Sequence, residues 1–256
     1  MKKAKYSLLL ACLLAIILLF AIKFAYAQAS VGVGLRIRPM PNIGFPHVNN
    51  SCFADQNPDF HFNVNHDSNV SSCVFKINNQ LNLTNDTNSS SAEMNFRFFN
   101  MALSSYNMSI NCTDIFNVST VTEFSFSVNS MRKFGGKTTN ISKVNCRNVS
   151  NFLLENASAG RINFSENLDL SNGFDIDSYV NISFNKIEID SDALSALNKS
   201  AVLEMTGLSF SNPRILFNGN VCPESICKKI SYSNGILKFN VSHWTSYEAE
   251  ETPAES

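Results

Sequence analysis

The residues whose chemistry is easiest to predict are the cysteines. The chain of 256 residues contains seven, and all but Cys12 lie beyond its apolar N-terminal run. Six cysteines in an exported chain are expected to form disulfides, with fifteen connectivities open to them. A zinc site is not expected, because the one close pair lacks C-x2-C spacing and has no histidine nearby. The six are Cys52, Cys73, Cys112, Cys146, Cys222 and Cys227.

Asparagine is the second residue type with a chemical use. The chain has 34 asparagines, and 15 of them begin the Asn-x-Ser/Thr acceptor sequence for N-linked glycans. Composition alone predicts only about six such sites, so the excess favours a glycosylated surface. The alternative is compositional, since an AT-rich genome also yields chains rich in Asn, Ile, Phe and Lys. The acceptor sites are Asn49, Asn69, Asn82, Asn85, Asn88, Asn107, Asn111, Asn117, Asn140, Asn148, Asn156, Asn163, Asn181, Asn198 and Asn240.

Other reactive groups are sparse. Asp169, Asn172, Asp175 and Asp177 surround Gly173 and offer oxygen ligands to Ca²⁺, although turn formation explains the same residues. No nucleophile elbow, phosphate-binding loop or H-E-x-x-H motif is present. No pair of carboxylates is marked for general acid–base work. We therefore predict no catalytic residue, no metal site and no cofactor, and we expect that the chain is not an enzyme.

The N-terminus predicts export. A basic start precedes an apolar run from Leu8 to Ile22, and Ala25-Tyr26-Ala27 is a small-x-small cleavage site, so residues 1–27 resemble a signal peptide. The alternative is a membrane anchor, because a bilayer needs about 20 apolar residues. In either case we expect a secreted or cell-surface chain, attached to a membrane only through the N-terminal segment if that segment stays uncleaved.

Charge excludes one class of partner. Beyond residue 27 the chain carries 16 basic and 21 acidic residues, a formal net charge of −5, with no large basic cluster. This sign disfavours binding to nucleic acid. Only 16% of the residues are charged, so amide and hydroxyl groups must supply most of the polar surface.

Apolar residues alternate with polar ones at a period of two, which predicts half-buried antiparallel strands. Five such runs, separated by polar turns, predict a β-sandwich. His61 and His66 are expected at a solvated strand end. The runs contain Phe60 to Val64, Cys73 to Ile77, Met94 to Phe98, Tyr106 to Cys112 and Phe124 to Val128.

Two of the cysteines share the inward phase of their strands. A disulfide between Cys73 and Cys112 would link two strands through the core. Tyr106 lies on the same phase and is placed like the aromatic residue of a tyrosine corner. The stretch from Tyr106 to Asp114 and the strand that follows it resemble the immunoglobulin-like domains of archaeal cell-surface proteins. The resemblance covers residues 51–130 and implies an immunoglobulin-like β-sandwich.

A second β-rich block follows a pause in the pattern. Gly135-Gly136 marks a predicted linker over residues 131–159, which contains Cys146. In the block over residues 160–248, the alternation changes phase before Ile187, which predicts a bulge or a bend. Asn234-Gly235 predicts a two-residue hairpin turn.

The block 160–248 also resembles a β module of secreted archaeal surface proteins. The resemblance rests on Pro213-Arg-Ile-Leu, on the Cys222-Pro pair, and on the closing Trp244 and Tyr247. It implies a display or adhesion role and a local Cys222–Cys227 disulfide across a hairpin loop. By elimination, Cys52 would pair with Cys146.

The expectation is an all-β protein with two antiparallel β-sandwich modules stapled by disulfides. Residues 28–50 would form an extended N-terminal segment and residues 249–256 an acidic tail. We expect an exported structural or adhesive glycoprotein whose partners are cell-envelope proteins or glycans. The alternative is a carbohydrate-binding module in which Trp244, Tyr247 or Tyr179 stacks on a sugar ring.

Overall fold

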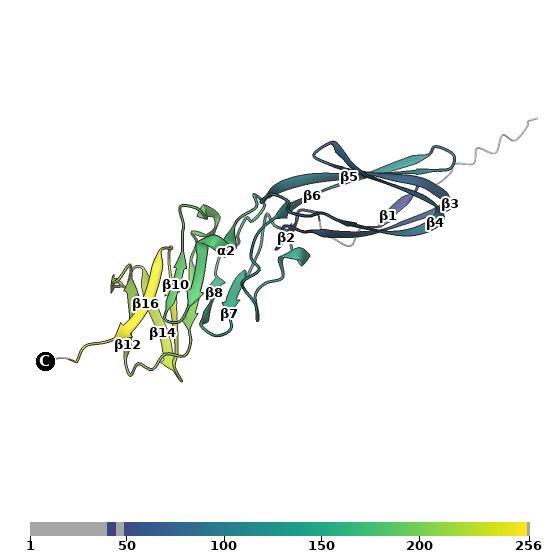
Figure 1. Ribbon diagram of the computed structural model, residues 1–256. Coiled ribbons are helices and arrows are strands. Elements are labelled where there is room, and N and C mark those ends of the chain that lie inside the picture. The colour runs from purple at the N-terminus through teal and green to yellow at the C-terminus, as the bar shows by residue number, and fades with distance from the viewer. Residues whose placement is uncertain (1–39, 45–48, 255–256) are drawn as a thin grey trace, which may run out of the picture. The chain divides into compact units, whose positions relative to one another are not determined.

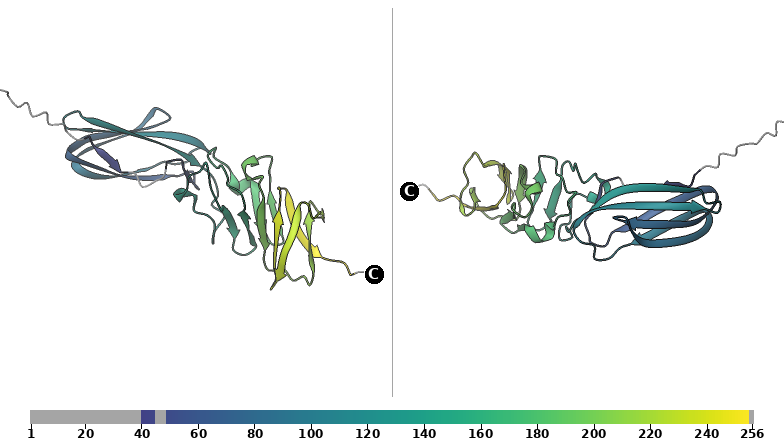
Figure 2. Two further views of the ribbon diagram at one scale, coloured as in Figure 1. Left: turned by 180° about the vertical axis from the view of Figure 1, so that it is seen from behind. Right: turned by 90° about the horizontal axis from the view of Figure 1, so that it is seen from above.

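The computed structural model describes residues 40–44 and 49–254. Over this part of the chain, three β-sheets account for the regular structure, with three short helical turns between strands (Figures 1 and 2). The predicted all-β, β-sandwich fold class is therefore confirmed. The signal or anchor segment 1–27 lies outside the described residues, as does most of segment 28–50. No helix in the described ranges is long and apolar enough to cross a bilayer.

The N-terminal module is a single six-stranded sheet. Its strand order is β1-β3-β5-β6-β2, with β4 on the other edge of β3, and all pairs are antiparallel except β2 with β6. The first strand lies within the segment predicted as an N-terminal extension, so the module begins before residue 51. The strands are β1 (Asn42–Gly44), β2 (Ser51–Phe53), β3 (Asp59–Ile77), β4 (Gln80–Arg97), β5 (Ser104–Asp114) and β6 (Ser119–Val128).

One sheet can enclose a core here because the β3–β4 ribbon bends over. Between Asn65 and Val70, β3 advances five residues while its partner advances only two. Phe75, in the second half of β3, reaches Phe96, in the second half of β4, with ring centroids 3.6 Å apart. Since these two residues lie far apart in the register of the ribbon, its two ends must face each other. The bend therefore produces two layers from one ribbon.

The C-terminal module consists of two five-stranded antiparallel sheets. Their orders are β13-β12-β16-β10-β9 and β14-β15-β11-β8-β7. Buried side chains from both sheets form one core, which includes Leu203, Phe239 and Tyr247. The strands are β7 (Leu153–Asn156), β8 (Gly160–Phe164), β9 (Val180–Ser183), β10 (Lys186–Ile189), β11 (Ala201–Met205), β12 (Pro213–Phe217), β13 (Asn220–Val221), β14 (Cys227–Ser233), β15 (Ile236–Val241) and β16 (Ser246–Glu251).

The helical turns are short and lie between these strands. The 3-10 turn η1 precedes β7, the α-helix α2 leads directly into β9, and the 3-10 turn η2 lies between β10 and β11. The bounds are η1 (Ile141–Lys143), α2 (Ile176–Tyr179) and η2 (Ser195–Leu197).

Two expected boundaries and one expected irregularity differ from the structure. The predicted linker 131–159 contains β7, and its Phe152 and Leu154 are fully buried in the C-terminal core, so much of it belongs to that module. The predicted tail 249–256 begins inside β16. The phase change before Ile187 is a hairpin turn between β9 and β10, where Asn185 has a φ of 54°, and not a bulge. A tight turn and a bulge shift the alternation in the same way, which explains the error.

Asparagine has a backbone role in these turns. All nine described non-glycine residues with positive φ are asparagines. Asn tolerates this left-handed region better than other residues with a side chain. Asn78-Asn79 and Asn234-Gly235 form two-residue hairpin turns, and the second confirms the hairpin predicted from the sequence. Part of the asparagine surplus therefore builds turns.

Candidate functional site: a disulfide-linked junction and an amide-rich surface

The structure contains three disulfides among the described residues. They join the pairs expected above: Cys73–Cys112 from the strand phase, Cys222–Cys227 from the resemblance, and Cys52–Cys146 by elimination. Cys73 bonds Cys112, Cys222 bonds Cys227, and Cys52 bonds Cys146, with Cα–Cα distances of 4.1, 5.9 and 5.4 Å. In the chain-entropy model, a bridge that closes a loop of about 100 residues stabilises a fold by about 4.7 kcal/mol. The same model assigns about 2 kcal/mol to a six-residue loop. The Cys52–Cys146 bridge, which spans 94 residues, is thus the most constraining of the three.

The Cys73–Cys112 bridge has a different geometry from the one expected. The two residues lie directly opposite each other on the adjacent strands β3 and β5, so the bridge stays within one sheet and does not cross the core. Both side chains are fully buried, as their inward phase predicted. Alternation identifies the face of a strand, but it does not identify the neighbouring strand.

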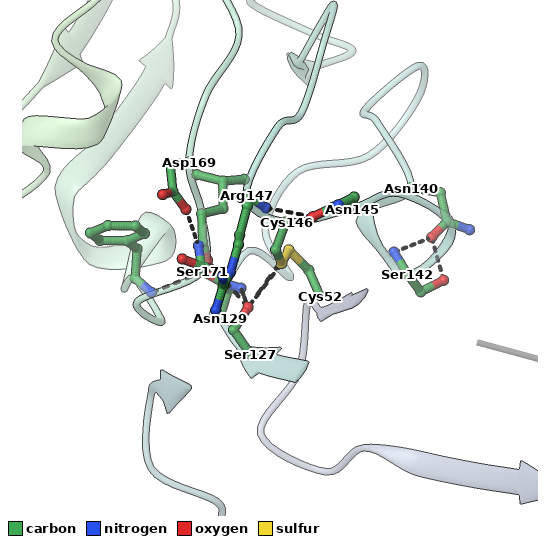
Figure 3. The surroundings of a disulfide bond; sticks show 12 residues. Cys52, Ser127, Asn129, Asn140, Ser142, Asn145, Cys146, Arg147, Asp169 and Ser171 are labelled. Atoms are coloured by element: carbon green, nitrogen blue, oxygen red, sulfur yellow. Dashed lines mark hydrogen bonds between the residues drawn. A yellow bond between two sulfur atoms is a disulfide. The ribbon is translucent and has the colours of Figure 1, made fainter. Parts of the chain in front are cut away.

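The Cys52–Cys146 bridge is the centre of a junction between the two modules (Figure 3). Cys52 lies on β2, and the N–H of Cys146 donates to the carbonyl of Asn50 at 2.7 Å. The hydroxyl of Ser127 on β6 lies 2.8 Å from the sulfur of Cys146 and donates to the carbonyl of Leu170 at 3.2 Å. Ser127 is only 1% exposed, so these contacts satisfy a hydroxyl that would otherwise be buried without partners.

A second set of contacts at the junction involves charged and amide groups. The buried Asn129 accepts a hydrogen bond from the N–H of Phe174 at 2.9 Å. The carboxylate of Asp177 accepts from the Ser130 hydroxyl at 2.7 Å and from two backbone N–H groups, of Arg132 at 2.8 Å and of Lys133 at 3.0 Å. We define the junction as the Cys52–Cys146 bridge together with residues 127–133 and 168–177.

The Lys133 side chain takes part in the same contacts. Its ammonium group donates to the backbone carbonyl of Asp177. Partial burial of the ammonium group lowers the pKa of Lys133, although the charges of Asp177 and Asp175 act in the opposite direction.

The carboxylates considered as calcium ligands accept hydrogen bonds within the junction and its turns. Asp169 accepts from the N–H of Ser171 at 2.9 Å, and Asp175 accepts from the N–H of Ser178 as the N-cap of α2. Asp177 is occupied as described above. Across the described residues, no three His, Cys, Asp or Glu side chains are grouped in a way that could hold a metal ion. Local hydrogen bonding thus accounts for the three carboxylates.

The predicted glycan acceptors lie at the surface. Of the fourteen sequon asparagines whose side chains are described, eleven are exposed, three are partly exposed and none is buried. The side chain of Asn82 lies outside the described set. The three partly exposed ones are Asn69, Asn111 and Asn156. A glycan has room at most of these positions, which is a necessary condition for the predicted modification.

Two of the acceptors share one groove of about 480 Å³ on the N-terminal module. The side-chain Oδ1 of Asn49 accepts from the N–H of Ser125 at 2.9 Å, and the side-chain Oδ1 of Asn107 accepts from the hydroxyl of the same serine at 2.7 Å. N-linked glycans are attached through the amide nitrogen. Both bonds to Ser125 can therefore persist in a glycosylated protein.

The aromatic residues considered for sugar stacking lie mainly in the core. Trp244 is 1% exposed and donates its indole N–H to the carbonyl of Lys199 at 2.6 Å. Tyr247 is fully buried, and burial raises the pKa of its hydroxyl strongly. These two rings cannot reach a ligand, so the stacking role that the carbohydrate-binding alternative gave them is wrong. Tyr179, at 43% exposed, remains at the surface.

Each module contains a tyrosine whose hydroxyl donates a hydrogen bond to the backbone carbonyl of the residue four positions earlier in the chain. Tyr106 donates to the carbonyl of Ala102 at 2.9 Å, and Tyr247 donates to the carbonyl of His243. This is the bond pattern of a tyrosine corner, which fixes the entry of the chain into a strand. The inward phase of Tyr106 indicated the first corner.

A buried polar cluster was missed by the sequence reasoning. His66 lies at the bend of β3 with its side chain 1% exposed, against the expectation of a solvated strand end. The Ser68 hydroxyl lies 2.7 Å from its Nδ1 and donates to Asp114 at 3.0 Å. Asp114 continues the inward phase of Ile110 and Cys112, and this was the available signal.

The chain shows only a weak likeness to known proteins. No family model matches the chain, and no curated protein matches it at a significant level. The fibronectin(III)-like modules of CbhA from Clostridium thermocellum are 12% identical over 84% of this chain and 80% of theirs, with a TM-score of 0.30. SGBP-B of the Bacteroides ovatus mixed-linkage glucan utilization locus, solved with a mixed-linkage heptasaccharide, is 15% identical over 81% of this chain and 62% of its own, with a TM-score of 0.28. At these scores the likeness carries no argument about function.

Proposed function

We propose that the chain is an exported cell-surface structural or adhesive glycoprotein that works without catalysis. The observation that carries the proposal is the pairing of all six described cysteines into disulfides, two of which are completely or almost completely buried. Disulfides form and persist in oxidising compartments outside the cytosol. The accessible sequons support glycosylation in the same compartment.

The structural role is supported by where the bridges and hydrogen bonds lie. The junction joins the modules covalently at Cys52–Cys146 and by buried hydrogen bonds from Ser127 and Asn129. A chain that bears load or displays a surface benefits from such cross-links, because they limit unfolding. The partners proposed for it are other cell-envelope proteins or glycans.

Intact mass of the natively produced protein tests this proposal. We expect a mass above that of the bare polypeptide, which falls to the bare value after chemical deglycosylation. We also expect no titratable thiol until reductant is added, apart from that of Cys12 if the N-terminal segment is retained. A native mass equal to the bare chain, together with six free thiols, would overturn the proposal.

Activity and ligand screens test whether the chain acts without catalysis and whether it binds carbohydrate. We expect no turnover of polysaccharides or peptides above that of a heat-denatured sample, and any reproducible turnover would contradict a non-catalytic role. Binding to a glycan array that is lost in Tyr179→Ala but kept in Tyr232→Ala would instead favour the carbohydrate-binding alternative.

A further inference from the structure

The Cys222–Cys227 disulfide differs from the other two in its accessibility. Cys222 is partly exposed and Cys227 is 5% exposed. The other four cysteines are at most 1% exposed, so reagents in solvent cannot reach their sulfur atoms in the folded protein. Thiol–disulfide exchange requires access to one sulfur of the bridge. Among the three bridges, only this one offers it.

Both cysteines line an open groove of about 520 Å³ on the C-terminal module. Three basic residues, Arg214, Lys228 and Lys229, line the same groove, together with one acidic residue, Glu224. Arg214 is paired with Glu250, and the Lys229 ammonium donates to the carbonyl of Pro213 at 2.8 Å. Lys228 is exposed and follows Cys227 directly in the chain. Cations beside a sulfur atom stabilise its thiolate form and attract anionic thiols.

We propose that Cys222–Cys227 is a thiol–disulfide exchange site that takes small anionic thiols. The thiolate of the incoming molecule attacks the sulfur of Cys222, the partly exposed cysteine of the pair, and forms a mixed disulfide there. The bond between Cys222 and Cys227 breaks, and its electron pair leaves with Cys227 as a thiolate in the groove that Lys228 also lines. Attack by this thiolate on Cys222 restores the bridge and releases the small thiol. No other oxidant or reductant takes part.

The loop around the bridge is held by bonds that do not depend on the disulfide. The N–H groups of Ile226 and Cys227 both donate to the carbonyl of Pro223, at 2.9 and 3.0 Å, and the N–H of Cys222 donates to Ile215 at 2.9 Å. The bridge spans only five residues, so its opening releases little chain entropy. In the mixed-disulfide form, the Cys227 thiolate therefore stays close enough to Cys222 to restore the bridge. This inference does not depend on the proposed function.

The first test uses the intact disulfide-bonded protein under native conditions. It is treated with 2-mercaptoethanesulfonate, then alkylated and mapped by mass spectrometry. We expect alkyl label at Cys227 and the 2-mercaptoethanesulfonate adduct at Cys222 to appear about tenfold faster than any modification of the other four cysteines, with the circular dichroism spectrum unchanged. Equal labelling of all six cysteines, earlier opening of a buried bridge, or loss of the spectrum with the first bridge would overturn the proposal.

The second test separates the roles of the two sulfur atoms and of the charge. The free thiol left by Cys227→Ser should react with a small aromatic disulfide about tenfold faster than the one left by Cys222→Ser. Equal or reversed rates would refute attack at Cys222. The rate at which each thiol opens the bridge is divided by its rate with a neutral model disulfide. On this scale cationic cysteamine should be slower than 2-mercaptoethanesulfonate, and Lys228→Gln should reduce the difference between the two rates. If Lys228→Gln leaves that difference unchanged, the proposed preference for anionic thiols is wrong.

Discussion

The ring of Phe62 lies 4.9 Å from the ring of Phe75, although both residues belong to β3. In an extended strand, residues this far apart in sequence would be separated by about 43 Å. The contact exists because the strand bends over between Asn65 and Val70. A single ribbon therefore supplies both layers of the N-terminal core, and that core depends on aromatic contacts across the bend.

Truncation of Phe75 tests this dependence. Phe75 is fully buried and contacts the rings of Phe62 and Phe96. We expect Phe75→Ala to lower the free energy of unfolding by about 3–5 kcal/mol, because it leaves a cavity between the layers. Denaturant titration followed by circular dichroism measures the loss. Phe99→Ala, at a ring that is 69% exposed, is the control and should change it by less than about 1 kcal/mol.

The contribution of each disulfide to the free energy of unfolding should increase with the length of the loop that it closes. Replacement of both Cys52 and Cys146 by alanine is expected to cost about 4–5 kcal/mol, because the unfolded chain regains the entropy of a long loop. The same replacement of Cys222 and Cys227 should cost about 2 kcal/mol. Denaturant midpoints of the two double variants provide the comparison. The reverse order would show that the junction bridge adds little constraint.

Asp177 should hold the backbone of the junction in place. Its carboxylate accepts hydrogen bonds from Ser130, Arg132 and Lys133. Asp177→Ala removes these partners and is expected to cost about 1–3 kcal/mol. Because Arg132 and Lys133 are exposed, limited trypsin digestion should cleave after them sooner in this variant. Asp169→Ala removes a single hydrogen bond, from the N–H of Ser171, and none from residues 130–133. It should leave the rate of cleavage after Arg132 and Lys133 unchanged.

Protonation of Asp114 should lower the stability of the N-terminal module at acidic pH. Burial alone would raise the pKa of Asp114, but bonds from the N–H groups of Val118 and Phe116, the Ser68 hydroxyl and the charge of His66 lower it overall. A carboxyl group with a lowered folded pKa stabilises the fold above its unfolded pKa of about 3.9, and this stabilisation is lost as the pH falls through the folded value.

Asp114→Asn should therefore melt at a lower temperature than the wild type at pH 7. The gap between the two should narrow below about pH 4, where the wild type becomes protonated. Thermal melts from pH 2.5 to 7 measure the gap. Asp67→Asn, at an exposed carboxylate on the same bend, should melt like the wild type throughout. A gap for Asp114→Asn that stays constant with pH would contradict the assigned role.

Period-two alternation predicted the strands and the inward faces of this fold. It separated Phe60 to Val64 from Cys73 to Ile77 as two runs, and these are the two halves of β3 on either side of the bend. It could not predict that Cys73 and Cys112 share a sheet, because pairing depends on contacts distant in sequence. Burial of His66 likewise depends on Asp114, a partner distant in sequence, which hydrophobic patterning does not reveal.

Asn156 should be the acceptor site whose amide matters most to the fold. Its Nδ2 donates to the carbonyl of Ile182 at 2.8 Å, which links β7 of one sheet to β9 of the other. Its Oδ1 accepts from the N–H and the hydroxyl of Ser158, at 3.2 and 2.8 Å. A glycan would have to be attached at the nitrogen that makes the inter-sheet bond. We therefore expect lower glycan occupancy here than at the exposed Asn163.

Matched glutamine variants measure the structural part of this role. In protein made without glycosylation, Asn156→Gln should lower the free energy of unfolding by about 1–2 kcal/mol, because the longer side chain misplaces both bonds. Asn163→Gln on β8 removes a sequon of the same kind at an exposed position and should cost less than about 0.5 kcal/mol. Glycopeptide mapping of the native protein then compares the two occupancies. Equal losses of stability together with equal occupancy would show that Asn156 is an ordinary surface acceptor.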